Sequence, residues 1–481
     1  MRKLIRFIVV CALLVCFMLT ATGCGTVIPD ADNLMRPPRA GDDGQEILDA
    51  LEQSLGTPFS LRYPIRGKNQ AAVMRADLNG DRTDEAVVFY RLVGESSGAR
   101  FAVLEKESEW RVIYTGQPPA GNSGDVDMVL FADLEGDGVS EMIIGWQTPN
   151  GRVLSAYLYV KGEAGGDIIQ IPVAADLIGY DELCAADFDG DGKDELIAAV
   201  IREGEASANL IRYREGGLVS SDAESCMLGG VYGFVYNIVG QLAPEVIVTV
   251  LGGYYGAHYI PGGDCPVVTP RPVVWDFAAG KLAALDSVGI GHAANNRPSD
   301  INGDGFLEIP SDEIFGYYVN NPAADPIYLT NWHRFTAAGE SGRPEAARAA
   351  TRIRFVREGF TLDCPESWLG EVTPVREKEE NAESDRVIYF YRNADDGGGL
   401  GEELFRIRLF SHDAWSALEP LDAVGGFGFR DDDPDPHFEM LGENSHAVFA
   451  CMIAEGQAAR DMGITVESLV AAFRAESGAA E

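Results

Sequence analysis

The chain has 481 residues and a formal net charge of −37, and 46% of its residues are hydrophobic. It is too long for one small core, so we expect two folded domains. Nucleic acids select basic patches, and so do anionic lipid surfaces, which argues against both as direct partners. The charge instead suits a soluble surface that meets cations or neutral and basic partners.

The first 23 residues have the features of a signal peptide. Three positive charges precede an apolar run from Phe7 to Leu19, which is short of the about 20 residues that a membrane-spanning helix needs. Small residues then lead into Cys24, a pattern that resembles a bacterial lipobox, although Ala21 stands where that pattern usually has Leu. The resemblance implies a lipid on the Cys24 sulfur and anchoring to the extracytoplasmic face of the cell membrane. The alternative is an ordinary secretory signal that is cut nearby.

Residues 24–56 are predicted to be a lipid-anchored linker and a short helix. Polar and apolar residues alternate at helical spacing from Asp42 to Leu55, and Gly56 and Pro58 end the pattern. The cysteines that follow Cys24 are few and include no CxxC pair, so free thiols are the expectation.

Four acidic loops in the middle of the chain align without gaps and begin at Asp77, Asp133, Asp187 and Asp300. The last spacing is about twice the others, so a degenerate fifth copy is expected halfway, at residues 237–245. Positions one, three, five and nine of the intact copies supply the candidate metal ligands: Asp77, Asn79, Asp81, Glu85, Asp133, Glu135, Asp137, Glu141, Asp187, Asp189, Asp191, Glu195, Asp300, Asn302, Asp304 and Glu308.

These loops have the chemistry of a calcium site. Oxygen ligands at positions one, three and five converge when the chain turns sharply at a glycine in position six, and position seven can offer its carbonyl. An EF-hand needs a carboxylate at position twelve, and none of the copies has one; each loop runs into an apolar, strand-like segment instead. The alternative is a set of solvated turns without metal.

The pattern resembles the FG-GAP/VCBS repeat of integrin-alpha-type propellers, over roughly residues 70–350. The resemblance implies that residues 57–350 form a β-propeller of at least five blades, with all loops on one rim and with structural Ca²⁺. Arg82 departs from the family by replacing the glycine at position six. The segments around 33–38 and 61–67 also resemble the start of repeat-bearing lipoproteins of Gram-positive, clostridia-like bacteria.

Residues 351–481 are predicted to form a small α+β domain. Strand-like runs occur at 387–391 and 404–410, and a helix-like run ends the chain at 466–475. The phrases GFTLDCPESW and LFRIRLF loosely resemble PsbP-like domains. The acidic run at 431–436 lacks glycine turns and is expected to be a solvated loop.

No catalytic motif is assigned: the chain has no HExxH or GxxxxGK[ST] sequence. The letters GESSG at 94–98 match GxSxG, but no nucleophile elbow is assigned to them. Tyr254, Tyr255, His258 and Tyr259 could line a sugar or peptide site, or simply pack in a glycine-rich loop. We therefore expect a non-catalytic binding or scaffold module that meets a cell-wall or surface glycan or another surface protein, with no catalytic residues assigned. The alternative is a cell-surface polysaccharide hydrolase or lyase built on the propeller.

Overall fold

The computed structural model describes residues 42–476, except for 95–97, 120–123, 163–164, 175–178, 255–266, 287–290, 294–295, 322–323, 325, 337–343, 377–385, 395–398, 421–426 and 429–437. Cys24, the distal part of the aromatic loop (Tyr255, His258 and Tyr259) and the acidic run at 431–436 lie outside the described residues. Within them, no helix has both the length and the apolar character to cross a membrane.

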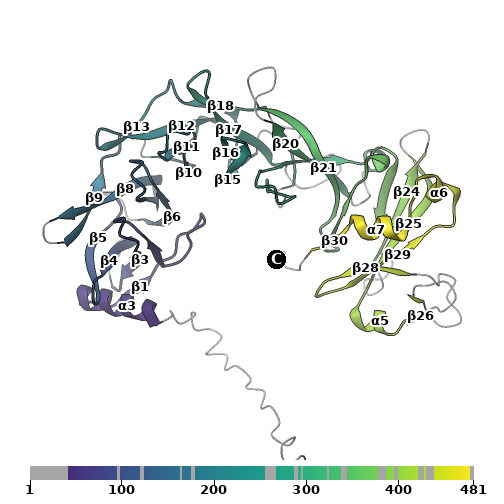
Figure 1. The fold of residues 1–481 in the computed structure, drawn as a ribbon, viewed down its shortest axis with the longest axis horizontal. Coiled ribbons are helices and arrows are strands. Elements are labelled where there is room, and N and C mark those ends of the chain that lie inside the picture. The colour runs from purple at the N-terminus through teal and green to yellow at the C-terminus, as the bar shows by residue number, and fades with distance from the viewer. Residues whose placement is uncertain are drawn as a thin grey trace, which may run out of the picture.

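The described chain is mainly β and consists of antiparallel sheets that follow one another along an arc (Figure 1). The first sheet contains β1 (Phe59–Leu61), β2 (Val73–Ala76), β3 (Glu85–Leu92), β4 (Arg100–Lys106) and β5 (Trp110–Gly116). The second contains β6 (Asp125–Ala132), β7 (Glu141–Thr148), β8 (Gly151–Gly162) and β9 (Gly165–Ile171). The third contains β10 (Glu182–Ala186), β11 (Glu195–Arg202), β12 (Glu205–Arg214), β13 (Gly217–Ser220) and β14 (Cys226–Gly230).

The fourth sheet contains β15 (Phe234–Ala243), β16 (Val246–Gly253), β17 (Thr269–Asp276) and β18 (Lys281–Ala284). It corrects the expectation of a degenerate acidic loop at 237–245. Most of that segment lies inside β15, which pairs with β16 from Phe234 to Ala243. A tight turn with Glu245 at a φ of 62° replaces the loop. Without acidic side chains to draw it into a loop, the apolar sequence extends both strands of the hairpin.

Neighbouring sheets share cores because alternate residues of a strand face opposite sides. In the first sheet, Val87 and Phe89 pack with the second sheet, where Met142 and Trp146 belong to the same cluster. Ile143 faces the other way, into a cluster with the third sheet. The third and fourth sheets share a further cluster in the same manner.

The outer face of the first sheet is covered by the helix α3 (Asp42–Leu55), which matches the predicted helix. Ile47 and Leu51 of α3 are fully buried and pack in one cluster with Ala86 and Val88 of β3. The helix therefore occupies the place that a preceding sheet would take. It closes that end of the series of sheets (Figure 1).

At the other end, the fifth sheet continues into the C-terminal part. It contains β19 (Ile309–Ile314), β20 (Tyr328–Thr336), β21 (Glu345–Phe355), β22 (Phe360–Asp363) and β30 (Phe473–Ala475). The predicted junction after residue 350 falls inside β21, which pairs with β20 on one side and with β22 on the other. The middle and C-terminal parts therefore share one sheet.

A further sheet carries the C-terminal core, with strands β23 (Val372–Arg376), β24 (Val387–Asn393), β25 (Leu400–Phe410), β28 (Glu439–Glu443) and β29 (Val448–Ile453). The short strands β26 (Glu419–Pro420) and β27 (Phe427–Gly428) pair with each other. The helices here are α4 (Gly316–Asn320), α5 (His412–Ser416), α6 (Gln457–Asp461), α7 (Val466–Ala472) and the 3₁₀ turn η2 (Glu366–Trp368).

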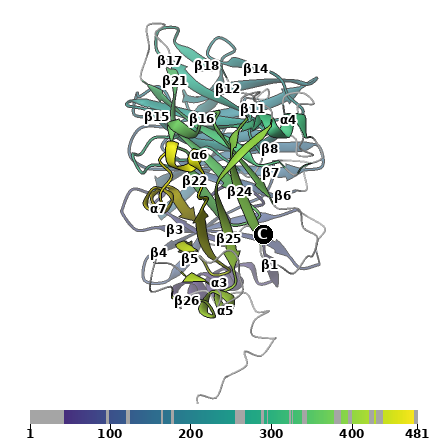
Figure 2. The same cartoon turned by 90° about the vertical axis from the view of Figure 1, so that its right-hand side faces the viewer.

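The predicted last helix is shorter than expected. It ends at Ala472, and Phe473–Ala475 become strand β30 beside β22. Phe473 supplies the reason, because its ring stacks on Phe360 within the core, 5.4 Å between centroids. Figure 2 shows α7 and β25 together at this end of the molecule. The described cysteines Cys184, Cys226, Cys364 and Cys451 are all free.

Candidate metal-binding loops

The four acidic loops occupy the same place in their sheets. Three of them connect two paired strands, β2 to β3, β6 to β7 and β10 to β11, and the fourth leads into β19. The second and third loops are hydrogen-bonded to each other: the Asp194 amide donates to the Asp133 carbonyl at 2.7 Å, and the Asp133 amide donates to the Asp194 carboxylate at 2.9 Å. Leu307 in the last loop donates in the same way to Gln241 of the degenerate copy, at 2.8 Å.

In every copy the aspartate at position one organises the turn. One of its carboxylate oxygens accepts the amide of the glycine at position four at 2.7 Å, in loops one to four alike. Its second oxygen accepts the amide of position six at 2.8–3.0 Å. The aspartate at position five caps the amide of position seven in the same four loops. These repeated contacts explain why the motif needs Asp at both positions whether or not an ion is bound.

Position six is left-handed in all four loops, as the sequence predicts. Gly138, Gly192 and Gly305 have φ values of 85°, 87° and 87°. Arg82 takes the same conformation, with a φ of 69°, at a cost on the order of 1 kcal/mol for a residue with a Cβ. The first loop is therefore the strained member of the set.

The glutamate at position nine is the buried part of each loop. Glu85, Glu141, Glu195 and Glu308 are between 0% and 4% exposed. Each accepts the backbone amide of position two, at 2.7–3.0 Å. Burial, with the neighbouring aspartates adding to it, raises the pKa of Glu85 and of Glu141 to about 7. A cation nearby would relieve this unfavourable burial of charge.

In the first and last loops an asparagine amide partly fills the role of a cation. Asn79 Nδ2 donates to Asp81 Oδ2 at 3.2 Å and to Glu85 Oε1 at 2.8 Å, while its Oδ1 accepts the Asp81 amide. Asn302 makes the same contacts with Asp304 and Glu308. Because the amide oxygen of each asparagine is already engaged, a metal ion would require these side chains to turn over.

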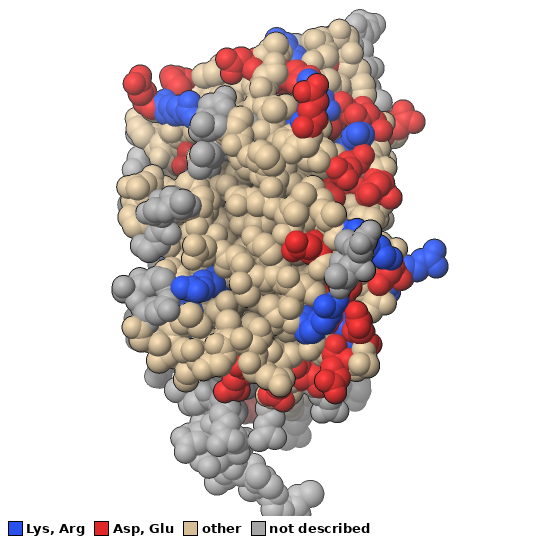
Figure 3. Space-filling view, turned by 90° about the vertical axis from the view of Figure 1, so that its left-hand side faces the viewer, with Lys and Arg blue, Asp and Glu red and all other residues tan. Residues whose placement is uncertain are grey.

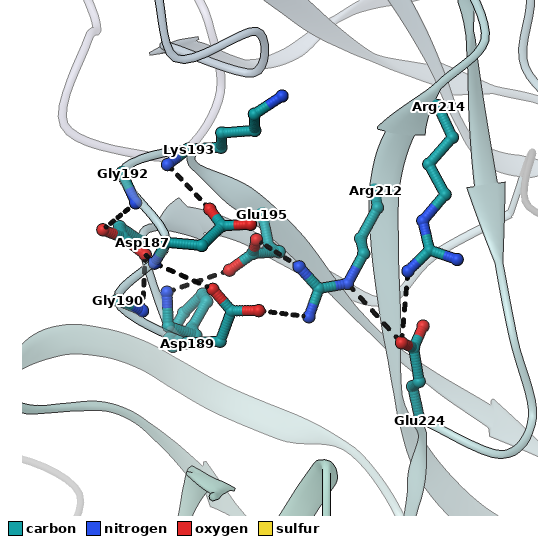
Figure 4. Close-up of polar contacts among 11 residues, drawn as sticks. Asp187, Asp189, Gly190, Gly192, Lys193, Glu195, Arg212, Arg214 and Glu224 are labelled. Atoms are coloured by element: carbon teal, nitrogen blue, oxygen red, sulfur yellow. Dashed lines mark hydrogen bonds and ion pairs between the residues drawn. The ribbon is translucent and has the colours of Figure 1, made fainter.

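In the third loop an arginine sits against the carboxylates (Figure 4). Asp187, Asp189 and Glu195 bring one oxygen each to within 4.8 Å of one another, the donor set that a divalent cation would use. Arg212 of β12 donates to Asp189 at 2.7 Å and to Glu195 at 2.6 Å, and its side chain is only 11% exposed. The guanidinium thus already compensates the charge of the most complete loop.

The last loop is compensated in a similar way. Arg334 of β20 pairs with Asp304 and lies 3.7 Å from Glu308. Neither arginine was singled out from the sequence. Strand register is the signal that could have identified them, because each arginine directly follows the strand partner of the residue after the position-nine glutamate. Arg212 follows Ile211, the partner of Leu196, and Arg334 follows His333, the partner of Ile309. The equivalent positions in the first two sheets are Glu105 and Leu158, which cannot provide this charge.

The second loop fits a divalent cation best by charge. Asp133, Glu135, Asp137 and Glu141 give it four carboxylates, and among the described residues no Lys or Arg forms an ion pair with any of them. The same holds in the described chain for the carboxylates of the first loop, which has only three. Among the described residues, three carboxylate oxygens lie within 4.8 Å of one another in the third loop but not in the second, so an ion bound to the second loop would have to draw its side chains inward.

A separate group of charged residues, also missed from the sequence, ties the first three sheets together. Arg66, in the segment after β1, donates hydrogen bonds to both carboxylate oxygens of Asp127, at 2.8 and 3.0 Å, and also forms an ion pair with Glu182. Tyr180 donates to Asp127 at 2.7 Å, and Arg152 lies 3.4 Å from the same carboxylate. Burial opposes ionisation, yet the hydrogen bonds from Arg66 and Tyr180 hold the pKa of Asp127 below its ordinary value.

The described part of the aromatic loop serves packing. Tyr254 exchanges backbone hydrogen bonds with Gly233 and Tyr232 and packs partly buried against the core between the fourth and fifth sheets. On the face formed by the outer strands of the first three sheets, Figure 3 shows charged side chains concentrated toward the edges and a largely uncharged middle.

No protein-family model matches the chain, and no curated protein matches it. Solved structures that resemble it include rhamnogalacturonan lyase YesW, at 13% identity over 72% of this chain and 77% of that chain, with a TM-score of 0.26. An exo-β-1,3-galactanase from Phanerochaete chrysosporium matches at 10% identity over 83% and 90%, with a TM-score of 0.28. A rhamnogalacturonan lyase from Bacillus licheniformis matches at 13% identity over 72% and 77%, with a TM-score of 0.26. Scores this far below 0.5 establish neither a shared fold nor a shared activity.

Proposed function

We propose that the chain is a lipid-anchored binding scaffold on the extracytoplasmic face of a bacterial membrane, held there through Cys24. The observation that carries the scaffold role is the repeated acidic loop, with two pairs of copies hydrogen-bonded to each other, on sheets whose two ends are covered by α3 and by the C-terminal core. Such an arrangement gives a stiff, continuous surface, as expected of a module that presents sites to a partner. Its partner in this proposal is a cell-wall or surface glycan or another surface protein.

We further propose that each sheet corresponds to one blade of an FG-GAP/VCBS-like propeller. In support, three intact loops each connect two paired strands of one sheet, and the fourth leads into the first strand of its sheet. The fourth sheet keeps this hairpin without the acidic residues.

Calcium, in this proposal, acts as a structural brace and not as a catalyst. The donor chemistry fits a hard cation in the first two loops, where three or four carboxylates have no described cationic partner. In the third and last loops the ion would have to displace Arg212 or Arg334. Partial occupancy of the set, led by the second loop, is the expected outcome.

Two measurements on the full chain test the proposal. Calorimetry with calcium and with EDTA reports whether calcium stabilises the fold. Equal melting curves would show that the loops are acidic turns that do not need calcium. Glycan and peptidoglycan arrays, probed with and without chelator, report whether the scaffold has a ligand. Binding to none of them, together with no captured surface protein, would remove the support for a scaffold role.

A second candidate function is a polysaccharide hydrolase or lyase. The observation in its favour is the group formed by Asp127, Glu182, Tyr180, Arg66 and Arg152, which brings two carboxylates, a phenol and two guanidinium groups together. Against it, Asp127 is 1% exposed and each of its oxygens is already hydrogen-bonded. Incubation with pectic and galactan polysaccharides, followed by reducing-end and unsaturated-product assays, decides between the two functions: turnover lost in Asp127→Asn would make the protein an enzyme.

A further inference from the structure

Arginines gather on one face of the fifth sheet. In β21, Ile353 and Phe355 point into the C-terminal core, so Arg352 and Arg354 between and beside them lie on the opposite face. The register places Arg352 between Thr330 and Asp363, and Arg354 beside Thr361. On a chain with a net charge of −37, two cations side by side on one sheet face need an explanation.

These side chains line a pocket of about 390 Å³, together with Arg297, Trp332, Asn296 and Glu476. Its volume lies within the about 300–1,000 Å³ usual for small-molecule sites. The lining comes from three separate parts of the chain: the segment before the last acidic loop, strands β20 to β22, and the end of β30. We call it the arginine pocket. Strand β30 lies on the inner side of the arc (Figure 1).

The cations of the arginine pocket have few acceptors. Arg352 donates to Asp363 at 2.8 Å, but Arg354 has only a 3.9 Å ion pair with Glu476, which is too long for a hydrogen bond. Arg297 lies over the ring of Tyr236 at 5.8 Å and forms no ion pair with any described residue. Each guanidinium carries five N–H donors, so most of those on Arg297 and Arg354 are unused within the described chain.

The wall of the pocket contains a further donor without a partner. Trp332 is 5% exposed, and its indole Nε1 is buried with no acceptor among the described residues. Buried polar groups are usually paired, and a native exception is often a mark of a binding site or a missing water.

We propose that the arginine pocket binds the carboxylate group of a small ligand. A guanidinium fork matches a carboxylate with two parallel N–H donors, and Arg297 and Arg354 have those donors available. Ser299 and Thr361, which also line the pocket, offer neutral hydroxyl groups for the hydroxyls of such a ligand. Glu476 favours a singly charged carboxylate over a phosphate, because its own charge repels a dianion more strongly. This inference does not depend on metal in the acidic loops.

Isothermal titration of the full chain tests the proposal, with four probes: galacturonate, acetate, neutral galactose and inorganic phosphate. We expect at least one of the two singly charged carboxylates to bind, more weakly at high salt, and galactose not to bind. Binding of galacturonate alone would identify the source as an acidic sugar, and binding of acetate as well would identify a simple carboxylate. Phosphate binding more tightly than both carboxylates would overturn the proposal.

Three variants locate the site. Arg297→Gln with Arg354→Gln should weaken carboxylate binding on the order of tenfold or more, because two charge-assisted contacts are lost. Glu476→Gln should strengthen it, since a like charge is removed. Arg348→Gln is the matched control: Arg348 lies in the same strand but pairs with Glu366 away from the pocket, and binding should not change. Unchanged binding in the double variant, or weaker binding in Glu476→Gln, would contradict the assignment.

Discussion

Arg212 Nη2 lies 2.7 Å from Asp189 Oδ2, so a guanidinium of the protein itself partly neutralises the third loop, which has the most complete acidic motif. A complete motif therefore does not by itself mean that the loop needs an ion. The number of acidic ligands in a loop does not decide whether the loop needs a metal ion, because the compensating arginine comes from another strand.

Arg212→Gln should turn the third loop into a calcium-dependent one. Removing one partner of a buried ion pair typically costs about 3–5 kcal/mol, and Glu195 is only 1% exposed, so we expect a loss of that order in EDTA. Calcium should recover part of it, since Asp187, Asp189 and Glu195 are already gathered. Chemical unfolding in EDTA and in calcium measures both effects. Arg214→Gln is the control, because Arg214 is largely exposed and its one ion pair with a described residue is to Glu224. Equal calcium recovery in the two variants would refute the idea.

Arg82→Gly should stabilise the first loop by about 1 kcal/mol, because glycine takes the φ of 69° without the Cβ penalty. The reciprocal change, Gly138→Ala in the second loop, should destabilise by a similar amount. A Cβ at Gly138 meets no atom within 4 Å, so the change tests backbone strain and not crowding. Differential scanning calorimetry of both variants measures the pair, and a destabilised Arg82→Gly would contradict the strain argument.

Arg66→Gln should destabilise the first three sheets together by about 3–5 kcal/mol, because it leaves Asp127 buried with its charge uncompensated on that side. Arg111→Gln serves as the comparison. Arg111 is 43% exposed and pairs with Glu105 and Glu107 at the surface, where a change below about 1 kcal/mol is expected. The measurement is the free energy of unfolding in denaturant, and losses of equal size would show that the Arg66 contacts are not special.

His292 should make stability fall in mild acid. Burial lowers the pKa of His292, whose ring is fully buried and bonded to Tyr236 and to the Ala293 carbonyl. Below pH about 6.5 this histidine becomes protonated in the unfolded chain, while in the folded chain it stays neutral to a lower pH. The contribution of His292 to the unfolding free energy then drops by up to about 1.4 kcal/mol per pH unit. The raised pKa values of Glu85 and Glu141 act in the opposite direction over the same range.

The test of that pH effect is the difference between variants, since the acidic surface has its own pH dependence. Unfolding is measured between pH 7.5 and 5.5 for the natural chain, for His292→Gln and for His446→Gln, whose side chain is exposed. The slope assigned to His292 should vanish in His292→Gln and persist in His446→Gln. A slope that persists in both would place the effect elsewhere.

The elements that depend on short-range sequence patterns could be predicted from the sequence. The helix at Asp42–Leu55 and the strands after each acidic loop follow from short-range patterns, and the structure has them. The ion pairs of Arg212 and Arg334 could not be predicted, because they depend on which residue of a later strand stands opposite the loop. The sequence also did not indicate that one sheet spans the predicted junction at residue 350. Strand β21 pairs with β20 of the middle part and with β22 of the C-terminal part, and such pairing cannot be predicted from local sequence patterns.

The position of α3 has a mechanical consequence. In the described chain, α3 lies between Asp42 and the first strand, so a pull applied at Asp42 loads the contacts of Ile47 and Leu51 before it reaches β1. Lys106 adds surface ion pairs to Asp43 and Glu46 at 3.0 and 3.3 Å, near the end where the load arrives. Under tension the helix should detach first and bare the apolar face of β3 and β4, while the sheets beyond stay intact.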